Sequence, residues 1–458
     1  MPYIPVTDSQ REDMLHRLGI LSLDELFSDI PAEHRYPDVQ LEAGKSELEV
    51  LRELSSMAAA NAHADSYRWF LGAGAYDHFI PAVVPALASR GEFLTAYTPY
   101  QPEVSQGTLQ AIFEYQSMVG ELVGMDVVNA SHYDGATALA EGVLMSLRNT
   151  EGRRRVLLPE ALHPEYKDVL GTYFSAYDVV LQEYSGSPAQ ATQNLQPSHT
   201  TSASTQGSLA PPQDDLAAVV VSYPDFFGRI PDLEGAAAAA HSRGALLIVH
   251  ADPIMLGLFK SPGAWGADIV SAEGQSLGND LSYGGPYLGI LGCTAELVRR
   301  LPGRLVGETK DVQGRRGFVL TLVAREQHIR REKAVSNICS NQGLMALRSC
   351  IYLAMMGKQG LREAAELCWH NAHYAAHRIE SLPGFSVDQG LFFKEFVVHT
   401  PIPAETLAER LYDTNIVPGL PLSRYFPERS HELLVCVTEK HNRADIEDLA
   451  LAMAEVTK

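Results

Sequence analysis

The sequence predicts an α/β fold with a mainly parallel sheet covered by helices on both faces. One observation is a series of short runs rich in Val, Ile and Leu, each close to Gly, Pro or an acidic residue: RRRVLLPE, DLAAVVVSYP, GALLIVHAD, ADIVSAE and YLGILGC. The other is that helical segments separate several of these runs, among them the alanine-rich PDLEGAAAAAHSRG. Continuously apolar strands between helices are typical of parallel sheets buried on both faces. Such sheets bind ligands at the carboxyl ends of their strands.

The elements divide into three predicted regions. Residues 1–60 form a helical arm that is broken at Pro5 and Pro31, with Asp8 or Ser9 as the cap of its first helix. This arm is too small to fold alone, so we expect it to wrap another surface. Residues 61–330 form the large α/β domain, and residues 185–214 within it are a polar insertion that we interpret as a surface loop.

Residues 331–458 are predicted to be a smaller α+β domain. Two long helices are predicted over 324–357 and 361–382, and the first of them crosses the boundary with the large domain. The strand FKEFVVHT, the helix AETLAERLYD, the strand HELLVCVT and a last helix from about Arg443 to Val456 follow.

The composition excludes several classes of partner. A net charge of −20 and a pI near 5.2 argue against nucleic acid and anionic membranes, because both are bound through Lys and Arg. The 5 cysteines are scattered and show no Cys/His spacing typical of a metal site. Together with the lack of an apolar signal segment or a run of about 18 apolar residues, this predicts a cytoplasmic protein without a membrane span.

The segment GADIVSAEGQSLGNDLSYGGPYLGILG, residues 266–292, reads as a strand, a glycine-rich turn and a second strand. In one large class of enzymes, such a turn carries the lysine that binds pyridoxal phosphate (PLP). This turn has no lysine, and the nearest ones are Lys260 and Lys310.

Three other positions have a ligand-binding and a structural interpretation. Gly135, Ala136 and Thr137 begin a predicted helix whose amides suit an anion, but Asp134 or Thr137 can cap the same helix, and a carboxylate there would repel a phosphate. Asp252 follows an apolar strand, where it can pair with a protonated pyridine nitrogen or cap the next turn.

His163 also follows a strand end. An imidazole there can stack on a flat cofactor ring, although the spacing alone favours a solvated loop histidine.

The stretch TAYTPYQPEVSQGTLQAIFEYQ places several polar and aromatic residues on a Pro-bounded loop before a helix that Ser105 can cap: Tyr97, Tyr100, Gln101 and Glu103. A loop on a rigid scaffold often carries function. The alternative is that the loop forms a contact between subunits. The two interpretations are compatible if the loop reaches the functional site of a neighbouring subunit.

Residues 304–333 concentrate Arg and Lys in an otherwise acidic chain. The spacing of Glu326 and Arg330 predicts ion pairs on a solvated or interface helix. Binding of an acidic partner protein is the more specific interpretation.

Several motifs together resemble the glycine cleavage system P-protein, the decarboxylating glycine dehydrogenase. They are FLGAGAYDHFIPAVV, YTPYQPEVSQGTLQAIFEYQ, SHYDGATALAEG, YPDFFGRIPDL, AEGQSLGNDLSYGGPYLG, GRLVGET and GFVLTLVAREQHIRREKAVSNICSNQ. The resemblance covers nearly the whole chain outside the polar insertion. The length and the missing lysine are similar to the alpha subunit of P-proteins that are split into two chains.

This resemblance implies the aminotransferase-like fold type I of PLP-dependent transferases, with the working lysine on the beta subunit. It places Ser276 near the vacant lysine position, His163 at the ring-stacking position and Asp252 at the pyridine-nitrogen position, and it puts residues 135–137 at the phosphate helix. The chain would thus carry the relic of a cofactor site, with no metal.

The implied partners are the beta subunit in an α2β2 assembly, the lipoylated H-protein and glycine. Since sites of this fold lie at dimer interfaces, Tyr97, Tyr100, Gln101 and Glu103 are the leading candidates for residues lent to the beta site. Two rivals stay open. One is a docking subunit that recruits the H-protein through residues 304–333. The other is a self-sufficient PLP enzyme, which Ser276 argues against because it cannot form a Schiff base.

Overall fold

The computed structural model describes residues 6–36, 40–150, 152–195 and 215–458. These belong to two compact units, Met1–Ala62 and His63–Lys458. Within the predicted insertion, a short helix α8 spans Pro188–Gln193, and residues 196–214 lie outside the described residues. The further division of the second unit near residue 330 stays a prediction.

The first unit contains two capped helices, α1 (Asp8–Leu18) and α2 (Glu47–Ala58). The cap of α1 is Thr7 rather than Asp8 or Ser9, because the Thr7 side chain accepts the Gln10 amide while the Gln10 side chain accepts the Thr7 amide. Neither helix contains a buried residue. The described part of this unit therefore has helices but no apolar core of its own.

The second unit is built on a seven-stranded mixed sheet in the order β2-β8-β7-β6-β5-β3-β4. Its strands are β2 (Val127–Val128), β3 (Arg155–Pro159), β4 (Val180–Tyr184), β5 (Leu216–Tyr223), β6 (Leu246–Ala251), β7 (Ile269–Glu273) and β8 (Gly289–Cys293). The pairs from β7 to β4 are parallel, and β8 is antiparallel to both neighbours. All the apolar runs predicted to be strands are confirmed. The edge strands β2 and β4 were not predicted, because β2 has 2 residues and VLQEY contains two polar residues among its 5.

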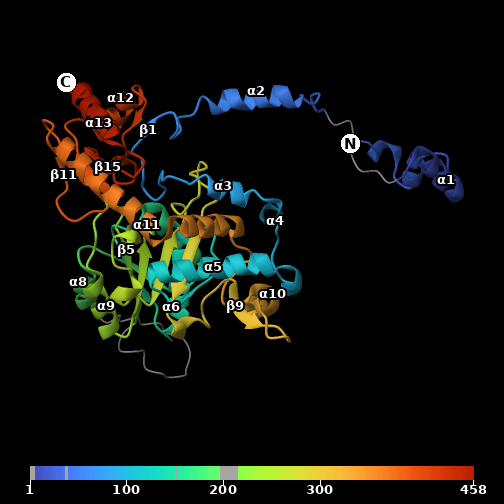
Figure 1. The fold of residues 1–458 in the computed structure, drawn as a ribbon, viewed down its shortest axis with the longest axis horizontal. Coiled ribbons are helices and arrows are strands. Elements are labelled where there is room, and N and C mark those ends of the chain that lie inside the picture. The colour runs from blue at the N-terminus through green and yellow to red at the C-terminus, as the bar shows by residue number, and fades with distance from the viewer. Residues whose placement is uncertain (1–5, 37–39, 151, 196–214) are drawn as a thin grey trace. The chain divides into compact units, whose positions relative to one another are not determined.

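Helices cover both faces of this sheet (Figure 1). Val219 and Val221 of β5 pack in a core with α5 (Gln106–Val123), α9 (Leu233–Ser242) and part of α11 (Gly343–Glu380). The alternate residues of the strand, such as Val220, pack in a second core with α6 (Gly135–Asn149) and α7 (Pro164–Phe174). Because side chains alternate along a strand, the apolar runs supply both cores at once.

The C-terminal part forms a four-stranded antiparallel sheet in the order β11-β12-β15-β14. Its strands are β11 (Ser386–Val387), β12 (Glu395–His399), β14 (Leu420–Pro421) and β15 (Glu432–Cys436), and its helices are α12 (Ala404–Tyr412) and α13 (Arg443–Val456). The predicted strands and helices of this region are confirmed. A parallel pair, β1 (Arg68–Trp69) with β13 (Ile416–Val417), joins an N-terminal segment of the second unit to this part.

The predicted helix over 324–357 is wrong in its first half. Residues 324–342 contain only α10 (Gln327–Arg330) and single 3-10 turns, and α11 begins at Gly343. Arg330 donates to the Ala324 carbonyl, while the Glu326 carboxylate lies 3.7 Å from His328. The α11 helix itself runs on to Glu380 through a kink at Gly357, whose φ of 58° is left-handed.

The short helices α3 (Val83–Ala88) and α4 (Gly91–Leu94) lead to α5, and β9 (Leu305–Lys310) pairs with β10 (Arg316–Thr321) as an antiparallel hairpin. Of the helices that the structure describes, none has the length and hydropathy required to cross a membrane.

The central strand β6 provides a test of this architecture. Ile248 of β6 is fully buried in the core with α6, so Ile248→Ala should lower the free energy of unfolding by about 2–5 kcal/mol through lost burial and the cavity it leaves. Urea denaturation measures this. The matched control Val180→Ala, on the edge strand β4 and 48% exposed, should change it by less than about 0.5 kcal/mol. Equal effects of the two substitutions would contradict the described core.

Candidate functional site

Asp252 lies at the carboxyl end of β6, and its two oxygens have different partners. Oδ1 accepts the backbone amides of Ile254 (2.9 Å) and Met255 (3.3 Å), so the side chain caps the next turn. Oδ2 lies 2.6 Å from the Nζ atom of Lys394. The predicted turn cap is therefore confirmed, and the cation that faces Asp252 is a side chain of the chain itself.

Lys394 immediately precedes β12 and is buried, with 1% of its side chain exposed. Its Nζ lies 3.5 Å from the centre of the Tyr76 ring, a cation–π contact, and 2.9 Å from Nε2 of His78. Burial alone would lower the pKa of this amine, but the Asp252 carboxylate raises it overall. The ammonium form is the stable one, which suits a buried ion pair and not a nucleophile.

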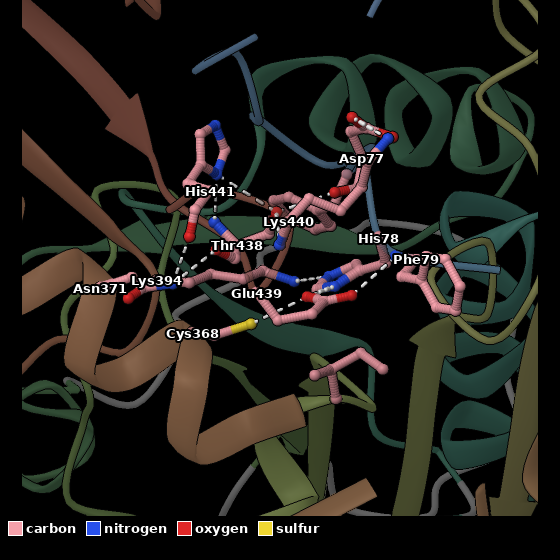
Figure 2. Close-up of polar contacts among 12 residues, drawn as sticks. Asp77, His78, Phe79, Cys368, Asn371, Lys394, Thr438, Glu439, Lys440 and His441 are labelled. Atoms are coloured by element: carbon pink, nitrogen blue, oxygen red, sulfur yellow. Dashed lines mark hydrogen bonds and ion pairs between the residues drawn. The ribbon is translucent and has the colours of Figure 1, made fainter. Parts of the chain in front are cut away.

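A relay of polar contacts continues from Lys394 (Figure 2). Since an ammonium only donates, Nε2 of His78 accepts from it, and Nδ1 of His78 donates to Glu439 at 2.6 Å. The Cys368 thiol donates to the same carboxylate at 3.2 Å. Although burial opposes ionisation, the hydrogen bonds from His78 and from the Phe79 amide hold the pKa of Glu439 below its usual range.

His78, Cys368 and Glu439 have the side-chain types that bind metal ions in proteins. The candidate ligand atoms of His78, Cys368 and Glu439 lie within 4.8 Å of one another. Each one, however, already has a hydrogen-bond partner within the relay, and the Lys394 ammonium adjoins it. A positive charge at this distance disfavours a second cation, so the relay is explained as an internal network.

Glu395 fixes the segment that covers the site. It accepts the Ala73 amide at 2.7 Å and the Tyr76 hydroxyl at 2.8 Å. The Gln275 side chain accepts the Tyr76 amide and donates to the Tyr76 carbonyl, at 2.9 and 3.0 Å. The segment around Tyr76 is thereby held between the turn after β7 and the small sheet.

The amino end of α6 is occupied by carboxyl groups. Asp134 accepts the Thr137 amide at 2.8 Å in a capping box, as the capping interpretation predicted. Glu273, the last residue of β7, accepts the Gly135 amide at 2.8 Å through one oxygen. Its other oxygen accepts the amides of Gln275 and Leu288 at 2.9 and 3.1 Å. Burial raises the pKa of Glu273 to about 8 despite these donors.

His163 caps α7 and is half-buried, which differs from a solvated loop histidine. Its Nδ1 accepts the Glu165 amide at 3.2 Å, and its Nε2 donates to the Ala73 carbonyl at 2.9 Å. The ring packs against Tyr166 and Phe226, with centroids 5.0 and 4.9 Å away. Burial lowers its pKa, so the neutral ring is favoured.

Ser276 lies in the turn after β7, where the lysine would be expected. It is buried, and its hydroxyl has no hydrogen-bond partner among the residues that the structure describes. A cavity of about 60 Å³ remains nearby, with a wall that includes His163, Asp252 and Glu273. Pockets for small ligands typically have about 300–1,000 Å³. The structure thus brings His163 and Asp252 together around a space too small for a cofactor.

The loop of Tyr97 belongs to a different place. Tyr97 and Tyr100 are 88% and 52% exposed. Tyr97 lines a cavity of about 330 Å³ together with Arg304 and Asn341, at the amino end of α11. Gln101 and Glu103 are also exposed. Among the described residues, this cavity and the one at Asp252 have no lining residue in common.

Ser105 precedes α5, but its side chain makes no capping hydrogen bond. The predicted basic helix is largely a hairpin with internal partners: Arg315 pairs with Asp311 and Arg316 with Glu308. Arg304 is buried and donates to Asn341 and to the Cys339 carbonyl.

Comparison with solved structures defines the fold class. A C-DES mutant with glycine covalently linked to its PLP cofactor is 12% identical, with a TM-score of 0.58 over 82% of this chain and 94% of that one. The inhibitor-bound glycine decarboxylase (P-protein) of the glycine cleavage system is 44% identical, with a TM-score of 0.86 over 100% of both chains. The fold is fold type I of PLP-dependent enzymes, as expected.

Sequence comparison gives the family. Residues 1–453 match the model of the glycine cleavage system P-protein. The "Probable glycine dehydrogenase (decarboxylating) subunit 1" of Desulforamulus reducens is 49% identical over 464 residues, which covers 100% of both chains. The chain therefore belongs to the glycine cleavage system P-protein family.

The cofactor of this fold does not fit the site as it stands. Asp252 is already paired with Lys394, the Gly135 and Thr137 amides already donate to carboxyl groups, and the remaining space is about 60 Å³. The glycine-rich turn also offers no amine.

Sequence reasoning missed the side chains that fill the site, which are Lys394, Glu273, Glu395 and His78. One signal was present. The run FFKEFVV places Lys394 and Glu395 inside an otherwise apolar strand, and buried charges in such a strand require partners.

The buried pair yields a test. Lys394→Ala leaves Asp252 charged and unpaired, so the free energy of unfolding should fall by about 3–5 kcal/mol in urea denaturation. The double variant Asp252→Asn/Lys394→Met removes both charges at similar volume and should recover most of this loss. If Lys394→Ala were no more destabilising than Lys440→Ala, which breaks the partly exposed pair with Asp77, the buried ion pair would be refuted.

Proposed function

We propose that this chain is the alpha subunit of a two-chain glycine cleavage P-protein and has no cofactor lysine of its own. The observation that carries this proposal is the closed site at Asp252, where Lys394 takes the place of a bound group. The name of the D. reducens relative, subunit 1, supports a second chain.

In this proposal, a homologous beta subunit provides the lysine and binds PLP, which serves there as the electron sink for loss of CO2 from glycine. The aminomethyl group then passes to the lipoyl arm of the H-protein. We further propose an α2β2 assembly in the cytoplasm. In this proposal, the loop of Tyr97 acts by binding, orienting or excluding water at that neighbouring site.

The contribution of this chain to the beta site is the loop of Tyr97, Tyr100, Gln101 and Glu103. These side chains are exposed and offer hydroxyl, amide and carboxylate groups. The Tyr100 ring contacts two side chains of the same chain: the Arg304 guanidinium and the centre of the His328 ring both lie 5.9 Å from its ring centre. A loop with a fixed base and free polar tips suits a role in a neighbour's site.

A docking subunit without active-site residues is the second candidate. The basic residues of the β9–β10 hairpin favour it, since they stand out in an acidic chain. Their internal pairs, such as Arg316 with Glu308, weaken this observation because they satisfy part of the charge.

Removing a hydroxyl group separates the two candidates. Tyr97→Phe and Tyr100→Phe should each lower glycine decarboxylation by the reconstituted complex, on the order of 10²-fold for a donor that acts on the reacting groups. Affinity for the beta subunit, measured by calorimetry, should not change. The control Tyr177→Phe alters another exposed tyrosine and should retain full turnover. Unchanged turnover in the loop variants would instead support the docking subunit.

A further inference from the structure

We propose that the cofactor-type site of this chain is closed at both ends by its own side chains. Lys394 occupies the cation position opposite Asp252, and Glu273 occupies the anion position at the amino end of α6. The loss of binding would then depend on these side chains as well as on the missing lysine. This inference concerns the chain alone and holds whether or not the Tyr97 loop reaches a partner.

The cation end is explained by the cost of burying a charge. Asp252 is buried, and a carboxylate in such a place requires a positive partner. A pyridinium ring and an ammonium group meet the same need, but two cations at short distance from one carboxylate would repel each other. With Nζ of Lys394 at 2.6 Å from Oδ2 and the Tyr76 ring on the same ammonium, the charge of Asp252 is already paired.

At the anion end, the backbone donors that an anion would need are already used. The first amides of a helix attract an anion, and a phosphate needs several of them together. Here the Gly135 amide donates to Glu273 and the Thr137 amide donates to Asp134. Glu273 is also fixed from its other side by the Gln275 and Leu288 amides, so it is built into the turn that follows β7.

The space between the two ends is closed as well. The cavity of about 60 Å³ is lined by His163, Tyr166 and His250 among others. Since His163 is held by Ala73 and Glu165, its ring is oriented by the protein and requires no ligand.

A site filled by Lys394 and Glu273 behaves differently from a site that has only lost its cofactor lysine. Restoring the amine alone, as Ser276→Lys, should not restore cofactor binding, because Lys394 and Glu273 still fill the two ends. Opening the ends without restoring the amine, as Lys394→Ala/Glu273→Ala, should permit noncovalent binding.

The experiment uses pyridoxine 5′-phosphate, which has the ring and the phosphate but no aldehyde to react with surface lysines. Binding to the full-length chain is measured by equilibrium dialysis for the unaltered protein, Ser276→Lys, Lys394→Ala/Glu273→Ala and the control Lys440→Ala. Lys440 pairs with Asp77 at 2.6 Å nearby, so its variant removes a lysine without opening the site. Circular dichroism and thermal unfolding report whether each variant is folded.

We expect the double variant to bind one equivalent roughly 100-fold more tightly than the unaltered chain, as two new charge-assisted contacts would give. Ser276→Lys and Lys440→Ala should bind no better than the unaltered chain. Addition of Asp252→Asn to the double variant should reduce the gain. A folded double variant with no gain, or tight binding by the unaltered chain, would overturn the proposal.

The single variants keep the test decisive if the double variant does not fold. n-Propylammonium should raise the melting temperature of Lys394→Ala by refilling the cation position, and inorganic phosphate should do so for Glu273→Ala. Neither additive should raise that of Lys440→Ala beyond the unaltered chain. Absence of both specific shifts would overturn the proposal.

Discussion

The buried ion pair between Asp252 and Lys394 is the interaction on which the rest of the site depends. It joins the carboxyl end of the central strand β6 to the start of β12 in the small sheet. Tyr76 and His78 lie against the same ammonium, and Glu439 completes the relay. Because two unscreened charges must stay together in a buried place, this pair fixes how the two sheets of the second unit meet.

The same pair links the fold to the proposed role. Enzymes of this fold bind PLP at the carboxyl edge of the sheet. In this chain, Asp252 is already neutralised by Lys394, so it is not available to pair with the pyridine nitrogen of PLP. In the proposed role, this chain therefore contributes through its surface. In the Tyr97 loop, Tyr97 lines another cavity, and the Arg304 guanidinium lies over the Tyr100 ring. A closed internal site and an open external loop are what a supporting subunit would require.

Much of this could be predicted from the sequence because apolar runs report burial directly. The strands β3, β5, β6, β7 and β8 were found in this way, and the Asp134 cap followed from its place before a helix. Long-range partners could not be found, since local periodicity says nothing about which side chains meet. The sequence therefore does not single out Lys394, although Lys260 lies nearer to the glycine-rich turn. That lysine packs instead over the Trp265 ring at 3.7 Å.

The most direct test is to locate the cofactor in the assembled enzyme. The complex of this chain with its lysine-bearing homologue is saturated with PLP, reduced with sodium borohydride, digested and mapped by mass spectrometry. The expected result is a reduced cofactor on the partner's lysine and none on this chain. A stoichiometric label on Lys394, or on any other lysine of this chain, would contradict the claim that its own site is closed.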